Sequence, residues 1–190
     1  VALAEPNWEV QTKATTNDSF IRFMWHLDQI GVPGAWDTTT GDPSVVVAVV
    51  DTGIIREHPD IQGQLIDGYD FISDAESAGD GDGIDPDPTD IGAGSNPFRS
   101  GDFHGLHVAG TIGANGNNNR GIAGVAYSSQ IMPLRALGAD GSGSTYDILQ
   151  SVRYAAGFSN DANTLPSSPA AVINLSIGAV SYTHLRAHET

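Results

Sequence analysis

The segment Val46–Asp51 constrains the fold of this chain more than any other. It consists of four valines and one alanine, and it ends in a carboxylate. A continuous β-branched run of this length is typical of a parallel strand that is buried on both faces. The catalytic and binding groups of open α/β sheets lie just outside the carboxyl ends of such strands. We therefore expect Asp51 to be a functional residue rather than only a turn former.

Strand and helix patterns alternate along the rest of the chain. Three more strands are predicted, at 68–72, 130–137 and 171–176. Helical spacing predicts helices at 25–36, at 104–113 and after the N-cap candidate Ser144. The last helix is expected to bury a face formed by Ile148, Leu149, Val152 and Ala156. This order predicts an α/β fold with a parallel sheet flanked by helices.

The composition excludes several classes of function. The 190 residues include 23 acidic and 8 basic side chains, which gives a formal net charge of −15. Such a surface repels nucleic acid phosphates and anionic lipids, and it suits cation binding or simple solubility. The absence of cysteine rules out disulfides and thiolate catalysis. No apolar run approaches the roughly 18 residues that a membrane span needs.

A histidine at the start of the predicted helix 104–113 is the second candidate for chemistry. Asp51 and His104 would be two thirds of a Ser-His-Asp triad, although a helix-capping role is the simpler alternative for His104. His107 is expected to pack on the buried side of the same helix. A metal site made of the two histidines is not favoured, because no third ligand has suitable spacing.

The motif Asp51-Thr-Gly also occurs in aspartic proteases, so an alternative hypothesis is that the chain is an aspartic protease. That hypothesis requires a second copy of the motif, or a homodimer of all-β chains. The alternation of strands and helices argues against it.

Residues 73–102 contain few apolar side chains and many Asp, Gly and Pro residues, so we predict a long loop. Asp80, Asp82 and Asp85 are candidate calcium ligands within it. The run does not fit the EF-hand template, because Asp85 stands where that loop needs glycine. A solvated acidic loop without metal is an equally good interpretation.

Six sequence blocks resemble those of subtilisin-like serine peptidases, and they occur in the order seen in that family. They are 51–53, 58–60, 104–111, 121–126, 137–143 and 173–178. The resemblance spans Trp25 to Gly178 and is strongest to secreted bacterial members with an acidic insertion before the catalytic histidine. It implies a subtilisin-like α/β fold, of which the chain would hold the N-terminal half only.

The resemblance implies specific roles for residues along the chain. Asp51 and His104 would be catalytic. Substrate would bind along two segments, Gly141, Ser142 and Gly143 on one side and Ser176, Ile177 and Gly178 on the other. Structural Ca²⁺ would be bound by the side chains of Asp60 and Asn118 and by the carbonyls of Arg120 and Ile122, with Asn117 or Asn119 as alternatives to Asn118. Polypeptide substrates and the chain's own propeptide would be its partners, in a secreted monomer.

The resemblance also divides the chain into three parts. Residues 1–19 would be a propeptide tail and linker, and residues 20–180 the N-terminal part of a catalytic domain. Residues 181–190 resemble a translated sequencing adapter rather than the family. No Gly-Thr-Ser block, which carries the nucleophile in the family, occurs in the sequence. The chain is therefore expected to be inactive by itself. A calcium- or peptide-binding pseudoenzyme that lacks the nucleophile is the alternative.

Overall fold

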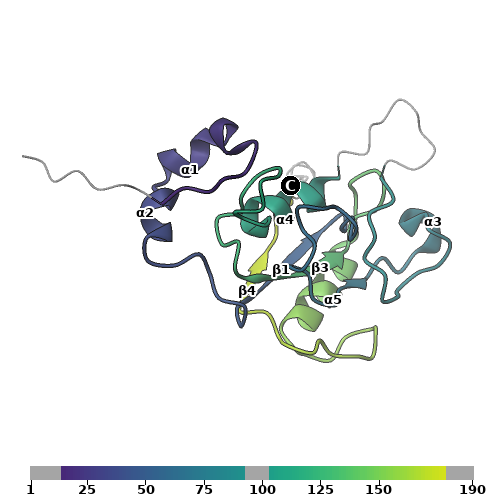
Figure 1. Cartoon of the computed structure of the whole chain (residues 1–190). Helices are drawn as coiled ribbons and strands as arrows, with labels where there is room; N and C mark the ends of the chain where they lie inside the picture. The colour runs from purple at the N-terminus through teal and green to yellow at the C-terminus, as the bar shows by residue number, and fades with distance from the viewer. Residues whose placement is uncertain (1–13, 93–102, 179–190) are drawn as a thin grey trace, which may run out of the picture.

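A computed structural model describes residues 14–92 and 103–178 (Figure 1). Its centre is a four-stranded sheet in the order β2-β3-β1-β4, and all three strand pairs are parallel. The strands are β1 (Val46–Asp51), β2 (Tyr69–Asp70), β3 (Gln130–Arg135) and β4 (Val172–Asn174). The predicted parallel α/β sheet is confirmed, and it excludes the all-β fold that the aspartic protease reading requires.

The helices also follow the predicted order, with two differences. They are the 3₁₀ turn η1 (Ile21–Phe23), α1 (Trp25–Gln29), α2 (Val32–Trp36), α3 (Ala75–Ala78), α4 (His104–Gly113) and α5 (Thr145–Ala155). The predicted helix 25–36 is two helices, because Gly31 between them has a left-handed backbone with φ of 76°. Helix α3 lies inside the predicted acidic loop, where the Asp74 side chain caps it by accepting a bond from Ser77 N.

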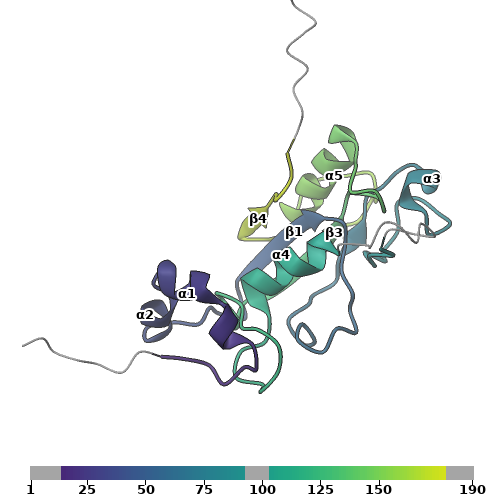
Figure 2. The ribbon, with the colours of Figure 1, turned by 90° about the horizontal axis from the view of Figure 1, so that it is seen from above.

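The two faces of β1 are covered by different helices. Val46, Ala48 and Val50 belong to a core cluster with Tyr154 and Ala155 of α5. Val49 instead belongs to a cluster with Ala109 of α4. Figure 2 shows α4 and α5 on opposite sides of the sheet. Burial from both sides explains why the strand is apolar at every position before Asp51.

Helix α5 buries a different face from the predicted one. Ser144 caps the helix as expected, by accepting a bond from Asp147 N at 3.0 Å. The fully buried positions, however, include Ser151, Tyr154 and Ala155, whereas Leu149 is 51% exposed. The small Ser151 lets the helix approach the sheet, so the buried face is rotated away from Leu149. Ile148 and Val152 do pack against the core, as predicted.

Helix α4 is placed by a close approach of two glycines. A Cβ at Gly105 would collide with the carbonyl oxygen of Gly53, so the helix N-terminus contacts the end of β1 only because residue 105 is glycine. The buried positions of α4 include Gly105, Ala109 and Gly110. His107 is exposed, so its predicted packing role is wrong. No helix in the described ranges is long and apolar enough to cross a membrane.

Candidate active site

Asp51 and His104 meet at the carboxyl end of β1. His104 is the first residue of α4, and its Nδ1 lies 2.8 Å from Asp51 Oδ1 and 3.0 Å from Asp51 Oδ2. The Asp51 side chain is 1% exposed, whereas that of His104 is 43% exposed. The buried carboxylate can fix the imidazole tautomer and stabilise an imidazolium, while the rest of the ring faces solvent. The arrangement can therefore accept and return a proton.

A short hydrogen-bond chain supports this pair. Thr52 N donates to Asp51 Oδ1 at 2.8 Å, and Gly105 N donates to Thr52 Oγ1 at 3.0 Å. Thr52 Oγ1 in turn donates to the buried Asp90 at 2.6 Å. The sequence interpretation did not single out Asp90, which lies at the end of the acidic run with no local pattern to mark it. The end of the acidic loop is thus tied to the backbone on both sides of the Asp51–His104 pair.

The predicted substrate-binding residues line one cleft together with His104. The cleft has a volume of about 780 Å³, and its walls include Thr52 and Leu137. Both predicted segments contribute to it: Gly141, Ser142, Gly143, Ser176, Ile177 and Gly178. The structure thus brings together residues that are more than 120 positions apart in the sequence, from Thr52 to Gly178.

Three of the predicted calcium residues, Asp60, Asn118 and Ile122, contact one another, although Ile122 does so through its N–H and not through the predicted carbonyl. Asp60 Oδ1 accepts a bond from Asn118 Nδ2 at 2.7 Å, and Asp60 Oδ2 accepts one from Ile122 N at 2.8 Å. The contact to Asp60 comes from Asn118 rather than from the neighbouring asparagines. Asp18, which the sequence interpretation missed, is 2% exposed and accepts bonds from Asn118 N at 3.1 Å and Asn117 N at 3.0 Å. Two buried carboxylates therefore hold this loop.

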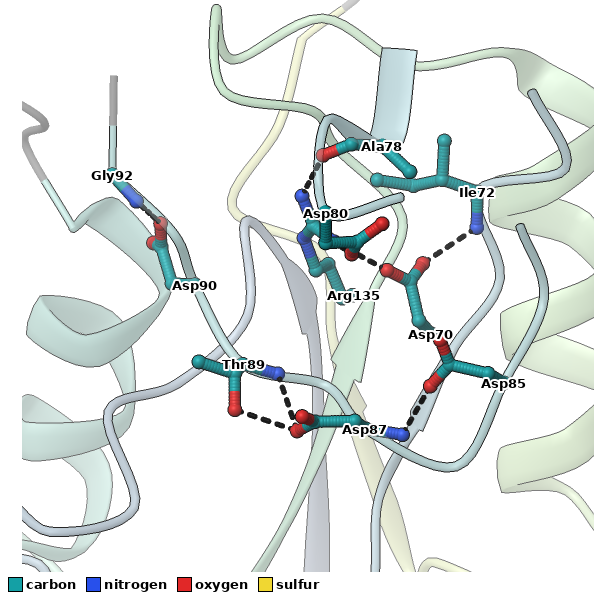
Figure 3. A network of polar contacts seen from close by, with 10 residues as sticks. All are labelled: Asp70, Ile72, Ala78, Asp80, Asp85, Asp87, Thr89, Asp90, Gly92 and Arg135. Carbon is teal, nitrogen blue, oxygen red and sulfur yellow. Dashed lines mark hydrogen bonds and ion pairs between the residues drawn. The ribbon is translucent and has the colours of Figure 1, made fainter. Parts of the chain in front are cut away.

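The structure does not assemble Asp80, Asp82 and Asp85 into a metal centre. Arg135 of β3, whose side chain is 1% exposed, forms an ion pair with Asp80 and donates to the carbonyl of Ala78 (Figure 3). Burial, together with the neighbouring carboxylate of Asp82, raises the pKa of Asp85. No group of three His, Asp or Glu side chains within 14–92 and 103–178 could hold a metal ion. A guanidinium serves as the counter-cation of Asp80, so the second predicted calcium site lacks structural support.

Arg135 also pairs with Asp70, a fully buried carboxylate on β2. The ion pair measures 2.5 Å, and Asp70 Oδ1 accepts a bond from Ile72 N at 2.7 Å. Burial raises the pKa of Asp70 to about 7, because desolvation outweighs the opposing effects of Ile72 N and Arg135. Asp70 is therefore a carboxyl group whose titration couples to folding near neutral pH.

Stability should fall with rising pH through the titration of Asp70. Its pKa is raised in the folded chain, so the stabilisation is complete below about pH 4 and is lost as pH rises through about 7. We expect Asp70→Asn to remove this component, so the stability of the variant relative to the wild type should increase between those pH values. Urea unfolding at several pH values measures it, and a pH-independent difference would contradict the assignment.

The sequence is similar to a family profile and to known proteases. The sequence profile of the Subtilase family matches residues 42–189. An extracellular protease of Xanthomonas campestris pv. campestris is 40% identical over 177 residues, covering 86% of this chain and 30% of that protein. The extracellular basic protease of Dichelobacter nodosus is 41% identical over 181 residues, covering 87% of this chain and 30% of that protein.

A solved structure has the same fold. A protease from Pseudoalteromonas arctica PAMC 21717 superposes with a TM-score of 0.80 at 41% identity, covering 89% of this chain and 53% of that one. The chain spans about a third of the length of the curated relatives and about half of the solved structure. The family match extends to residue 189 and so includes most of the segment 181–190. That segment lies outside the described residues, and its predicted foreign origin stays a prediction. The chain belongs to the subtilase family.

Proposed function

We propose that this chain supplies the aspartate and the histidine of the triad of a secreted serine endopeptidase. The observation that carries the proposal is the double contact of His104 Nδ1 with the buried Asp51, at the wall of a cleft. His104 would accept the proton of the serine hydroxyl and return it to the leaving amine. Asp51 would orient the imidazole and stabilise its protonated form. Secretion is supported by relatives that are named extracellular proteases.

The cleft would bind polypeptide substrates as an added strand. Gly141, Ser142 and Gly143 are exposed residues at one wall, and Ser176, Ile177 and Gly178 line the other. An extended peptide placed between them would gain backbone hydrogen bonds, which provide affinity independently of its side chains. The chain's own propeptide would use the same cleft. Nothing in this arrangement requires a second copy of the chain, so we propose a monomer.

The nucleophile would lie outside this sequence, which contains no Gly-Thr-Ser block. We expect the purified chain to hydrolyse peptides negligibly and to give no specific adduct with a fluorophosphonate. The test of function is a chimaera in which residues 14–178 replace the matching segment of the Xanthomonas campestris protease. Casein hydrolysis by the chimaera would support the proposal. Tight peptide binding without hydrolysis would favour a pseudoenzyme instead.

Structural calcium is part of the proposal. The side chains at the 117–122 loop carry oxygens of the kind that Ca²⁺ prefers: the carboxylates of Asp18 and Asp60 and the Asn118 amide. The Asp60 carboxylate and the Asn118 amide already touch. A half-turn of that amide would present Oδ1 to the ion, in exchange for the bond that Oδ1 accepts from Arg120 N at 2.8 Å. The residues therefore fit the ion, which would offset the repulsion between the two buried carboxylates.

Calcium should accordingly stabilise the chain. A ligand that binds only the folded state adds about 2.7 kcal/mol when its free concentration is 100 times Kd. We expect the melting temperature to be higher in calcium than in chelator, and Asp60→Asn to shrink this difference. Asp28→Asn, at an exposed carboxylate of α1, is the control with the same change of charge. Identical melts of the wild type in both buffers would remove calcium from the proposal.

A further inference from the structure

A second cleft adjoins the proposed substrate site. It has a volume of about 540 Å³ and lies between α3 of the acidic loop and the segment that leads into α5. Ser142 and Gly143 line both this cleft and the one that contains His104. The two clefts therefore adjoin at the 141–143 segment, along which we propose that a peptide binds.

Carboxylates from three segments line this second cleft. Asp74 caps α3, and Glu76 lies within it. Asp140 lies in the loop after β3, and Asp147 lies in the first turn of α5. Hydrogen bonds from Ser77 hold the pKa of Asp74 below its usual value, so this carboxyl group stays ionised. The described residues that line the cleft include no Lys, Arg or His. The cleft is thus uniformly negative.

Asp147 is the member that points to a ligand. It is 5% exposed and lines the cleft, yet its Oδ1 has no hydrogen-bond partner in the described part of the chain. A buried carboxylate oxygen without a partner is costly, and nearly all such groups in native proteins are satisfied. A cation bound in the cleft would give Asp147 the partner that the chain itself does not provide.

The walls of the cleft are held in place from behind. The loop after β3 approaches α3 so closely that a Cβ at Gly138 would collide with the Ser77 carbonyl oxygen. Arg135 fixes the other end of α3 through the Ala78 carbonyl and Asp80 (Figure 3). The spacing of the carboxylates is therefore set by buried contacts rather than by loose surface loops.

We propose that this cleft is a specificity site for the cationic side chain, Lys or Arg, of a bound peptide. The inference rests on the proposed peptide-binding function of the neighbouring cleft. A long side chain with a terminal charge suits a cavity of this size, and a guanidinium or ammonium group can donate to several carboxylates at once. A metal ion is less suited, because the described carboxylates that line this cleft do not form a group of three that could hold one.

Peptide binding to the purified 190-residue chain tests this site. The probes are fluorescein-labelled Ala hexapeptides that carry one Arg, or its neutral isostere citrulline, at each position in turn. Fluorescence anisotropy should show one position at which Arg binds roughly tenfold tighter than citrulline, as expected for a buried charge-assisted hydrogen bond. Asp147→Asn should reduce that ratio to below about threefold and leave the affinity for the citrulline peptide unchanged.

Further variants and outcomes keep the test decisive. Asp74→Asn combined with Asp140→Asn removes two exposed charges and keeps an oxygen acceptor for the Ser77 and Ser142 N–H groups. It should therefore lower the ratio even if Asp147→Asn disturbs folding. Asp28→Asn should leave the ratio of Arg to citrulline affinity unchanged.

If the citrulline peptides bind but no position prefers Arg, this inference is wrong and the proposed function stands. If no peptide binds, the proposed function fails and the inference falls with it. An Arg preference abolished by millimolar Ca²⁺, with Ca²⁺ binding lost in Asp147→Asn, would identify a metal site instead.

Discussion

Arg135→Met should lower the free energy of unfolding by about 3–5 kcal/mol, because it leaves a buried carboxylate without its counter-charge. Asp70 is fully buried, and Arg135 is its ion-pair partner at 2.5 Å. The same guanidinium holds Asp80 and the carbonyl of Ala78, so α3 should loosen as well. Urea unfolding at about pH 9, above the pKa of about 7 of Asp70, measures the loss.

Two controls separate this effect from the loss of any positive charge. Arg22→Met removes an exposed arginine of η1 whose guanidinium lies over the Phe23 ring, and it should cost less than about 1 kcal/mol. Asp70→Asn in the Arg135→Met background should regain part of the stability, because it removes the stranded charge. A loss below about 1 kcal/mol for Arg135→Met would show that the buried cluster contributes little to folding.

In the catalytic chimaera, His104→Ala should lower kcat by about 10⁶ and Asp51→Asn by about 10⁴. The first figure is the loss measured for the corresponding histidine of subtilisin, a member of the same family. The physical reason is that, within the part of the chain that the structure describes, His104 is the one titratable side chain that lines the cleft, and it contacts the buried carboxylate. Initial rates of peptide hydrolysis at saturating substrate measure both effects.

His107→Ala is the matched control for the histidine variant. His107 lies one turn further along α4, is exposed, and does not line the cleft that contains His104. Its replacement should change kcat by less than about threefold. Equal losses for the two histidines would show that α4 is only a structural element, and the catalytic assignment of His104 would have to be withdrawn.

Local signals in the sequence were sufficient for the elements that matter most to the site. The β-branched run before Asp51 predicts a strand covered on both faces, and the bounds of α4 are as predicted because its glycines and alanine suit close packing. The Ser144 cap of α5 was also predicted correctly, since capping depends on residues three positions apart. Solvent exposure on these helices was predicted less well. His107 and Leu149 face solvent, because the direction of a helix face is set by what packs on it.

The acidic loop shows most clearly what the sequence could not reveal. Spacing alone marked Asp80, Asp82 and Asp85 as possible cation ligands, and nothing near them in the sequence indicated Arg135 as the partner of Asp80. The roles of Asp18, Asp90 and Asp147 likewise depend on segments that are distant in the chain or on a missing partner. Burial and hydrogen-bond satisfaction are properties of the packed chain, so no local pattern encodes them.

The sequence by itself determined the order of strands and helices, the family, and the two residues that meet at the end of β1. These follow from periodicity, from capping, and from motifs whose residues are close together in the chain. Only the tertiary structure decided which carboxylates are paired, which are buried, and which lack a partner. The reason is that the energy of a charge depends on its desolvation and on its neighbours in space, and folding brings those neighbours from far along the chain.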